Sequence, residues 1–261
     1  MNAVPARVLS IAGSDSSGGA GIQADIKTVT ALGGYAMTAI TAITVQDTTG
    51  VHGFHPVPPA IVADQICAVL RDIGADAIKT GMLVSAACVE AVADALAPYS
   101  SLPLVVDTVM IAKGGHALLD DSGIAAMKRR LFPSAALITP NAPEAARLTG
   151  IAVESPDDCA RAGLMLRANG ARAVLVKGGH IAGDKVTDVL VDETGVHTFT
   201  GERIGNPSTH GTGCTLASAI ATGLAQGLTL RDAVVRGRTF VQDAIRNGLA
   251  LGHGTGPVYG R

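Results

Sequence analysis

The sequence predicts a single-domain α/β fold in which helices cover both faces of a mostly parallel sheet. Three observations predict it. Short apolar runs alternate with segments of helical periodicity along the whole chain. Apolar residues make up 48% of the composition but aromatic residues only 3%, so alanine, valine, isoleucine and leucine must fill the core. The length of 261 residues suits one large α/β domain, and we expect residues 1–261 to form it.

Six apolar runs are expected to form the buried strands, at residues 8–11, 36–45, 77–79, 104–107, 136–139 and 173–177. Buried strands that alternate with helices pair in parallel and are joined by right-handed crossovers. Two further runs, 186–191 and 196–200, flank the turn Asp192-Glu-Thr-Gly195. This spacing predicts a hairpin at one edge of the sheet.

The segments between the strands have the periodicity of helices. The clearest one follows Pro58 and Pro59, after which apolar residues recur on one face through Ile73. The expected helices are 21–32, 59–73, 86–96, 122–131, 144–148, 157–168, 215–226 and 230–249.

Charge and composition exclude several classes of function. The formal net charge is -2 and the basic residues are scattered, so we expect no nucleic-acid partner. The amino terminus lacks the pattern of a secretory signal and no apolar run is long enough to span a bilayer, so we expect a cytoplasmic protein without a membrane partner. The four cysteines have neither CxxC spacing nor nearby histidine pairs, which argues against structural zinc and against a disulfide framework.

The segment Asn206-Pro-Ser-Thr-His-Gly-Thr-Gly-Cys214 leads directly into an expected helix. A glycine-rich turn at a helix start leaves backbone N–H groups unpaired, and the helix dipole favours negative charge there. We therefore predict a phosphate site at Gly211, Thr212, Gly213 and Cys214. The alternative is an ordinary helix start whose glycines only allow the turn. Cys214 is also the one cysteine in a polar, glycine-rich context, where a helix N-terminus can lower a thiol pKa.

Polar residues follow the predicted strands at the point where each strand ends. In open α/β sheets, ligands bind beyond the carboxyl ends of the strands. The polar strand ends lie at 12–21, 46–48, 79–82, 107–109, 139–144 and 177–180. We expect these segments to form one site.

Phosphoryl transfer needs groups that hold nucleotide phosphates and a divalent cation. Lys177 ends a strand and could contact phosphates; the alternative is simple exposure. Asp107, with Asn141 and Glu144, offers oxygen ligands for Mg²⁺. The alternative for Asn141 and Glu144 is capping of a helix that begins near Pro143.

The first glycine-rich loop, 12–21, matches neither GxGxxG nor GxxxxGK[ST], which excludes a Rossmann fingerprint and a Walker loop. Its small residues could instead let a flat substrate lie against the backbone, with Asp15 or Asp25 as a polar contact. The amide of Gln46 could pair in a bidentate way with a ring nitrogen and its exocyclic amine. The alternative is a glutamine that faces solvent.

Together these segments resemble the hydroxymethylpyrimidine kinase and phosphomethylpyrimidine kinase family of thiamin biosynthesis, within the ribokinase superfamily. The resemblance covers essentially the whole chain. The matching segments are 11–25, 40–42 with Gln46, 79–83, 106–110, 137–141 with Glu144, 177–180 and 209–214. The resemblance implies a three-layer ribokinase-like fold with a small edge hairpin or flap.

The resemblance also implies a two-step activity. ATP phosphorylates the hydroxymethyl group of 4-amino-5-hydroxymethyl-2-methylpyrimidine, and a second ATP converts the monophosphate to the diphosphate. Mg²⁺ is the implied cofactor, and a homodimer built partly through edge strands near residues 35–56 is the implied assembly.

The family pattern assigns roles to individual residues. The pyrimidine is expected among Gly13, Ala20, Gln46, Met82, Val109 and Cys214, with Asp25 nearby. Lys177 is assigned to the ATP phosphates, Asp107, Asn141 and Glu144 to the magnesium and phosphate region, and 211–214 to the anion hole.

Cys214 stands where the wider superfamily usually has an aspartate that acts as general base. An alcohol acceptor benefits from a base, whereas a phosphate monoester is already anionic. The hypothesis is that Cys214 assists the first phosphorylation more than the second; the alternative is that it only shapes the pocket. The sequence also departs from its relatives at Asp47, usually asparagine, and at Thr80, usually aliphatic. The glycine-rich segment 111–116, with Lys113, is expected to be a flap.

Two rival functions remain open from the sequence. A pyridoxal kinase could use the same scaffold, although pyridoxal lacks the exocyclic amine that Gln46 would recognise. A non-catalytic nucleotide-binding module is the second rival, and the intact Lys177, Asp107 and Glu144 argue against it.

Overall fold

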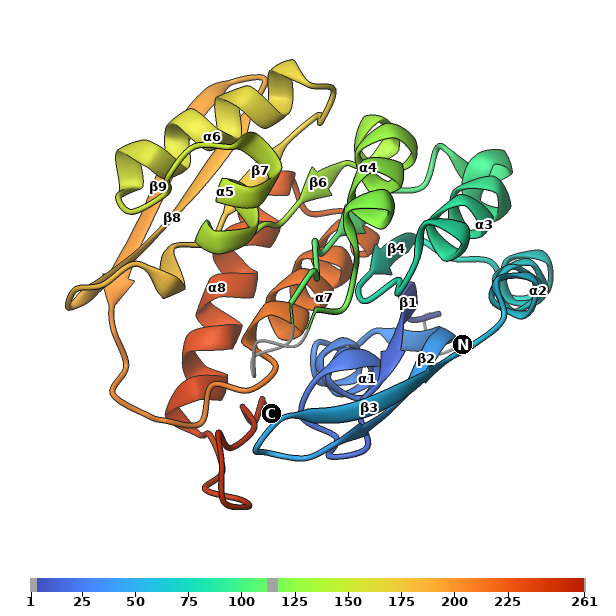
Figure 1. Ribbon diagram of the computed structural model, residues 1–261, viewed down its shortest axis with the longest axis horizontal. Helices are drawn as coiled ribbons and strands as arrows, with labels where there is room; N and C mark the ends of the chain where they lie inside the picture. Colours follow the sequence, from blue (N-terminus) through green and yellow to red (C-terminus); the bar gives the residue numbers. More distant parts are fainter. Residues whose placement is uncertain (1–3, 112–116, 261) are drawn as a thin grey trace.

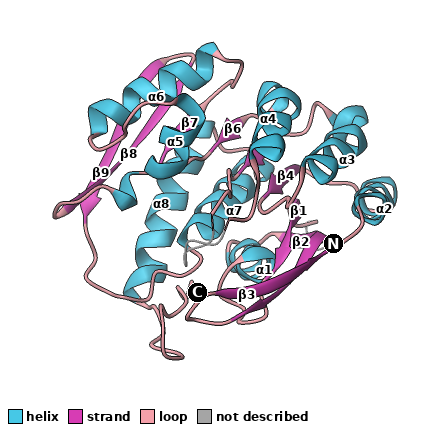
Figure 2. Ribbon diagram, viewed as in Figure 1, coloured by secondary structure: helices cyan, strands magenta, loops and turns pink. Residues whose placement is uncertain are grey.

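A computed structural model describes residues 4–111 and 117–260 and shows three layers with the sheet in the middle (Figure 1, Figure 2). The described residues form one sheet of nine strands in the order β3-β2-β1-β4-β5-β6-β7-β8-β9. The strands are β1 Arg7–Ser14, β2 Tyr35–Gln46, β3 Val51–Pro56, β4 Ala77–Thr80, β5 Leu104–Val106, β6 Leu137–Ile138, β7 Val174–Val176, β8 Lys185–Asp192 and β9 Gly195–Glu202. Neighbouring strands pair in parallel from β2 to β7, whereas β3, β8 and β9 pair antiparallel.

Helices cover both faces of the sheet. They are α1 Gly21–Ala31, α2 Pro59–Asp72, α3 Ala86–Leu96, α4 Asp121–Arg130, α5 Ala142–Thr149, α6 Pro156–Ala168, α7 Thr212–Ala225 and α8 Leu230–Arg246. Short 3-10 turns follow at Ala97–Tyr99, Phe132–Ser134 and Gly178–His180. One buried cluster joins the sheet to α2 through α6, and a second joins it to α1, α7 and α8. The predicted three-layer α/β architecture is therefore confirmed.

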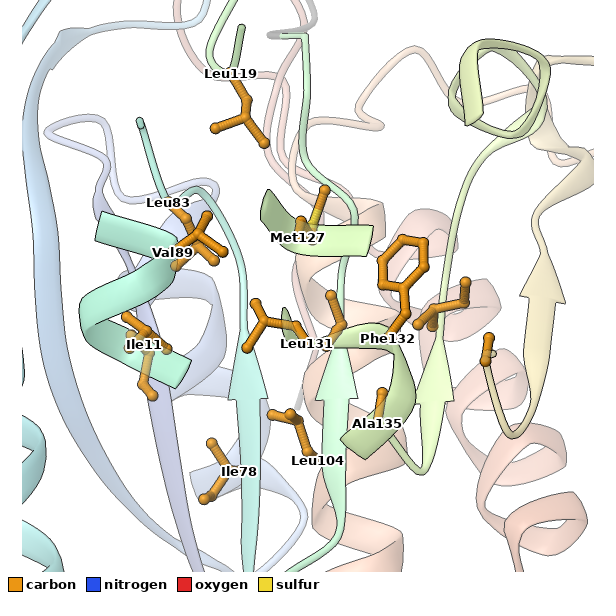
Figure 3. Close-up of a cluster of buried hydrophobic side chains, with 14 of the residues drawn as sticks. Ile11, Ile78, Leu83, Val89, Leu104, Leu119, Met127, Leu131, Phe132 and Ala135 are labelled. Carbon is orange, nitrogen blue, oxygen red and sulfur yellow. The ribbon is translucent and has the colours of Figure 1, made fainter. Parts of the chain in front are cut away.

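The core consists mainly of aliphatic side chains, as the composition predicts. Figure 3 shows Ile78 and Leu104 from neighbouring strands beneath Leu131 and Phe132. All four side chains are buried. The described part of the chain contains no helix with both the length and the apolar character needed to cross a bilayer.

The predicted element boundaries agree closely with the structure, with two exceptions that bear on the site. Residues 51–56 form an edge strand that the sequence analysis did not predict, because the run Val51–Pro56 mixes histidine and glycine with apolar residues and stays largely exposed. Helix α7 begins at Thr212, three residues earlier than expected, so the glycine-rich segment itself forms the first turn. The predicted hairpin at the other edge is confirmed by β8 and β9. The expected flap falls mostly on 112–116, outside the described residues.

Thr80 provides a test of core packing. It lies between Ile11 and Val106 in the sheet register, is fully buried, and its hydroxyl has no hydrogen-bond partner among the described residues. An unpaired buried hydroxyl costs about 1–3 kcal/mol. We therefore expect Thr80→Val to raise the free energy of unfolding by about 1 kcal/mol in urea titrations.

Thr139→Val is the matched control for this substitution. Thr139 is also fully buried at a strand end, but its hydroxyl donates to Asp107 Oδ1 at 3.0 Å. Loss of the Thr139 hydroxyl should lower the free energy of unfolding, because it removes a hydrogen bond to a buried carboxylate. Equal destabilisation by both substitutions would show that the Thr80 hydroxyl does have a partner.

Candidate active site

The carboxyl ends of the central strands meet at one edge of the sheet. Backbone hydrogen bonds continue the ladder past the strands, from Gly81 to Ile11, from Asp107 to Thr80, and from Lys177 to Pro140. Asn141 and Lys177 form an additional parallel bridge. The polar strand ends that the sequence analysis grouped together are therefore adjacent in space.

Lys177, which is partly exposed, forms an ion pair with the buried Asp107 at this edge. Lys177 Nζ lies 2.8 Å from Asp107 Oδ1. Burial alone would raise the pKa of Asp107, but the charges of Lys177 and Lys79 outweigh it and hold that pKa below its usual value. Burial alone would likewise lower the pKa of Lys177, but Asp107 and Glu144 raise it. Both groups are charged at neutral pH.

The start of helix α7 faces this ion pair. A Cβ atom added at Gly213 would lie 3.4 Å from Lys177 Nζ and 3.8 Å from Asp107 Oδ2. Gly211 has φ of 85° and packs so closely on Gly19 that a Cβ there would lie 1.8 Å from the Gly19 carbonyl oxygen. Within residues 4–111 and 117–260, no side chain caps the N-terminus of α7. Its first N–H groups can therefore bind an anion beside Lys177.

The structure corrects the expectation of a lowered pKa for Cys214. Burial raises the pKa of this thiol to about 11, and the carboxylates of Asp25 and Asp107 add to the rise. The charge of Lys79 and a hydrogen bond from the Gly21 backbone offset it only in part. Burial and the two nearby carboxylates thus outweigh Lys79 and the Gly21 hydrogen bond, and the thiol is protonated at neutral pH.

The rate of alkylation reports the protonation state of the Cys214 thiol. Because the thiolate is the reactive form, its modification by iodoacetamide should rise about tenfold per pH unit from pH 7 to pH 10 without a plateau. Peptide mass spectrometry distinguishes modification at Cys214 from modification at the partly exposed Cys67, which serves as the internal control. A rate that levels off near pH 7 would contradict the raised pKa.

Asn141 and Glu144 form the capping box of α5. Asn141 Oδ1 accepts from the Glu144 backbone at 2.9 Å, and Glu144 Oε2 accepts from the Asn141 backbone at 2.8 Å. The Thr108 hydroxyl also donates to Glu144 Oε2, at 3.0 Å. The capping interpretation that the sequence left open is therefore confirmed, and it does not by itself exclude a metal role.

The donor set is compatible with Mg²⁺. Burial raises the pKa of Glu144, Lys177 lowers it in part and Asp107 raises it further, so a nearby cation would favour the ionised carboxylate. The described residues hold no group of three or more acidic, histidine or cysteine side chains of the kind that encloses a metal. Mg²⁺ usually binds through one or two carboxylates together with waters and substrate phosphates, which agrees with Asp107 and Glu144 as candidate ligands.

Asp25 lies at the centre of a buried network of protein donors. Asp25 is 1% exposed and pairs with the fully buried Lys79, whose Nζ lies 2.9 and 2.8 Å from its two oxygens. Ser10 and Ser218 also donate to it, at 2.5 and 2.6 Å. Its oxygens are thus already occupied by protein donors, and the expected substrate contact by Asp25 stays a prediction.

Lys79 is a functional candidate that the sequence analysis did not single out. A signal was present in the run Ala77–Thr80, because a lysine within a short buried strand requires a buried partner. Burial alone would lower its pKa, but Asp25, Cys214 and Asp107 raise it. Lys79 therefore carries a positive charge directly below the predicted site.

Gly13, Met82 and Val109 come together as predicted. A Cβ atom added at Gly13 would lie 3.1 Å from Met82 Sδ, and Met82 packs in one small cluster with Val109. Val84, in the same cluster, has φ of 67°, and the Ser85 backbone donates to the Leu83 carbonyl at 2.7 Å. This arrangement is a strained γ-turn, which holds the chain beside Met82.

Gln46 and Ala20 lie at the other side of the α7 entrance. Gln46 Nε2 is 3.3 Å from His210 Nε2, and that ring nitrogen is 3.0 Å from Asp15 Oδ2. The Ala20 backbone also donates to Asp15, at 2.7 Å. Gln46 and His210 line a small cavity of about 60 Å³ together with residues 47–51 and Thr255. His210 was missed because nothing in the sequence links it to residues nearly two hundred positions earlier.

Comparison with known proteins identifies the family. Residues 15–259 match the family model described as phosphomethylpyrimidine kinase. The chain belongs to that family. It is 54% identical over 252 residues to the thiamine biosynthesis bifunctional protein ThiED of Geobacter sulfurreducens, covering 96% of this chain but 51% of that protein. The chain thus spans about half the length of this relative.

A second relative matches over nearly its full length. The hydroxymethylpyrimidine/phosphomethylpyrimidine kinase of Streptomyces coelicolor is 48% identical over 254 residues, which cover 97% of this chain and 94% of the relative. Among solved structures, an ADP complex of Bacillus subtilis pyridoxal kinase superposes with a TM-score of 0.91 at 35% identity, over 97% of both chains. The predicted kinase family and its ribokinase-like fold are confirmed, and the fold is shared with an enzyme named for a different acceptor.

Proposed function

We propose that this chain phosphorylates 4-amino-5-hydroxymethyl-2-methylpyrimidine with ATP and then phosphorylates the resulting monophosphate to the diphosphate, for thiamin diphosphate synthesis. One observation carries the proposal. In a chain of the phosphomethylpyrimidine kinase family, the start of α7 converges with Lys177 and Asp107 at the carboxyl edge of the sheet. Because the reaction consumes ATP, we place it in the cytoplasm.

The nucleotide end of the site consists of charged groups and backbone amides. Lys177 contacts the phosphates of ATP as a point charge. The N–H groups of Thr212, Gly213 and Cys214 bind the phosphoryl oxygens as charge develops on them. Asp107 and Glu144 hold Mg²⁺ with its waters, and Asn141 fixes the position of Glu144 through the capping box. When bound, Mg²⁺ supplies charge that neutralises the phosphate oxygens.

The acceptor end consists of small and apolar groups with one amide. Gly13, Ala20, Met82 and Val109 provide space and apolar contact for a flat ring, and Gln46 recognises its polar edge. Asp25 supports this wall from below through Lys79. Cys214 shapes the pocket; with its thiol protonated, it does not provide a base that would favour the first phosphorylation over the second.

A pyridoxal kinase activity is the second candidate, because an enzyme of that name shares the fold with a TM-score of 0.91. The higher identities of 54% and 48% to relatives named for thiamine biosynthesis and for pyrimidine phosphorylation favour the pyrimidine. The amide of Gln46 favours it as well, since the pyrimidine offers both a ring nitrogen and an exocyclic amine.

Phosphorus NMR tests the proposed activity. With Mg²⁺, ATP and the pyrimidine alcohol, we expect a monoester signal that is later replaced by a diphosphate signal, while ADP accumulates. A non-catalytic nucleotide-binding module would bind ATP and leave all signals unchanged. A monoester that never proceeds further would restrict the activity to the first step.

We also propose that the chain forms a homodimer through the edge formed by residues 35–56. Three large apolar side chains on β2 are exposed there: Tyr35, Ile43 and Val45 are 51%, 56% and 64% exposed. Light scattering should show a dimer for the wild type and a monomer for Val45→Lys, because a buried lysine would be desolvated at the interface. An unchanged mass for the variant would place the interface elsewhere.

A further inference from the structure

One nitrogen of His210 faces two side chains at the acceptor end of the site. His210 Nε2 lies 3.0 Å from Asp15 Oδ2 and 3.3 Å from the amide of Gln46. A ring nitrogen either carries a hydrogen and donates or lacks it and accepts, so the two contacts together fix the roles of both neighbours.

Asp15 decides that this nitrogen is a donor. The carboxyl group is 2% exposed and accepts from the Ser17 backbone and hydroxyl, both at 2.8 Å, and from the Gly19 and Ala20 backbones at 3.0 and 2.7 Å. Burial alone would raise its pKa, but His210 and these donors lower it to about 2. An ionised carboxylate only accepts hydrogen bonds, so His210 Nε2 must carry the hydrogen.

The orientation of the Gln46 amide follows from this assignment. With its nitrogen toward His210, two donors would face each other. The amide oxygen would then face Thr44 Oγ1 at 3.2 Å, although the single hydroxyl hydrogen of Thr44 is already donated to the Ser14 carbonyl at 2.8 Å. Turning the amide by a half-rotation resolves both conflicts, because its oxygen then accepts from His210 and its nitrogen donates to Thr44.

The histidine ring itself is held firmly. A Cβ atom added at Gly19 would lie 2.4 Å from His210 Cδ2, so the ring packs directly on the Gly19 backbone. The His210 backbone donates to Gly256 at 3.0 Å and accepts from Val258 at 3.1 Å. The neighbouring residue, Gly211, begins the predicted anion hole, so the ring is tied to the loop that holds the phosphates.

We propose that His210 is a positioning residue that locks the amide of Gln46 with its oxygen toward His210 and its nitrogen toward Thr44. The locked amide keeps one lone pair and one N–H for the acceptor. This pattern complements a ring that carries an exocyclic amine next to a ring nitrogen, and it disfavours rings that lack the amine. The substrate part of the proposal rests on the proposed function, whereas the orientation of the amide does not.

Selectivity between two acceptors tests the positioning role. In His210→Phe, we expect the ratio of kcat/KM for the pyrimidine alcohol to that for pyridoxal to fall about tenfold, through a higher KM for the pyrimidine and an unchanged KM for ATP. His210→Gln, which restores a donor at a similar reach, should recover most of the ratio. Ser17→Ala is the matched control, because it removes a different donor from Asp15 and should leave the ratio unchanged.

Nitrogen NMR of the unliganded protein tests the orientation without any turnover. We expect a hydrogen on His210 Nε2, and side-chain amide signals of Gln46 that shift in His210→Phe but not in Ser17→Ala. The inference is overturned if His210 Nε2 carries no hydrogen. It is also overturned if His210→Phe lowers kcat/KM equally for both acceptors, or if Ser17→Ala changes the ratio of kcat/KM values as much as His210→Phe does. A wild-type protein that phosphorylates neither acceptor would refute the proposed function, while the amide signals would still decide the role of His210.

Discussion

Replacement of Lys177 by methionine should lower kcat/KM for ATP-dependent phosphorylation about 10²- to 10³-fold, the loss typical of removing one group that stabilises transition-state charge. Lys177 Nζ is the ammonium group beside both Asp107 and the start of α7. Steady-state kinetics with saturating acceptor measure the loss. Circular dichroism in urea checks that the variant remains folded.

Two further variants test whether the effect depends on the position and geometry of Lys177 or only on the loss of one positive charge. Lys177→Arg keeps the charge but changes its geometry, so we expect partial activity. Lys185→Met removes an exposed lysine a few residues along the chain and should retain full activity. A loss of less than about fivefold in Lys177→Met would refute a direct contact with the transferring phosphate.

Replacement of Asp25 by alanine should lower the free energy of unfolding by about 3–5 kcal/mol, more than any other substitution proposed above. The reason is that it leaves the buried charge of Lys79 without a counter-ion. It also removes the acceptor for the hydroxyls of Ser10 and Ser218. Urea unfolding measures the change. Because Lys79 is fully buried, water cannot solvate its unpaired ammonium group unless the surrounding structure rearranges.

The double variant Asp25→Leu with Lys79→Met distinguishes stability from function. Replacing a buried ion pair with apolar side chains often leaves stability near that of the wild type. We therefore expect the double variant to recover most of the lost stability but not the activity, because the site loses the charge of Lys79 below Cys214 and Asp107. Full recovery of activity would show that the pair has only a structural role.

The mostly parallel sheet and the grouping of polar strand ends could be predicted because both follow from local patterns. Apolar runs indicate buried strands, and in a parallel sheet all carboxyl ends lie at one edge. This geometry is sufficient to bring Lys177 and Asp107 together, although no short-range signal connects them.

What could not be predicted depends on long-range pairing. Asp25 was expected only as a polar contact near the substrate, because the chain direction alone does not show that its side chain turns toward Lys79, 54 positions later. The pKa of Cys214 was expected to be low because the sequence shows the helix terminus but not the surrounding burial and carboxylates. His210 was missed for the same reason, since its partners Asp15 and Gln46 lie far away in the sequence.

The shared scaffold explains why the acceptor must be decided by few side chains. A pyridoxal kinase superposes over nearly the whole chain, so strand order and core packing do not select between a pyrimidine and a pyridine ring. We propose that selection falls to groups at the strand ends, above all to the amide of Gln46 and the residues that orient it.

Competition between acceptors decides which ring this chain phosphorylates. Purified protein with Mg²⁺ and ATP receives equal concentrations of the pyrimidine alcohol and pyridoxal, and mass spectrometry follows both products. We expect the pyrimidine monophosphate to form at least ten times faster than pyridoxal phosphate and to proceed to the diphosphate. An advantage of this size is what one buried polar contact supplies. Preferential formation of pyridoxal phosphate would contradict this expectation.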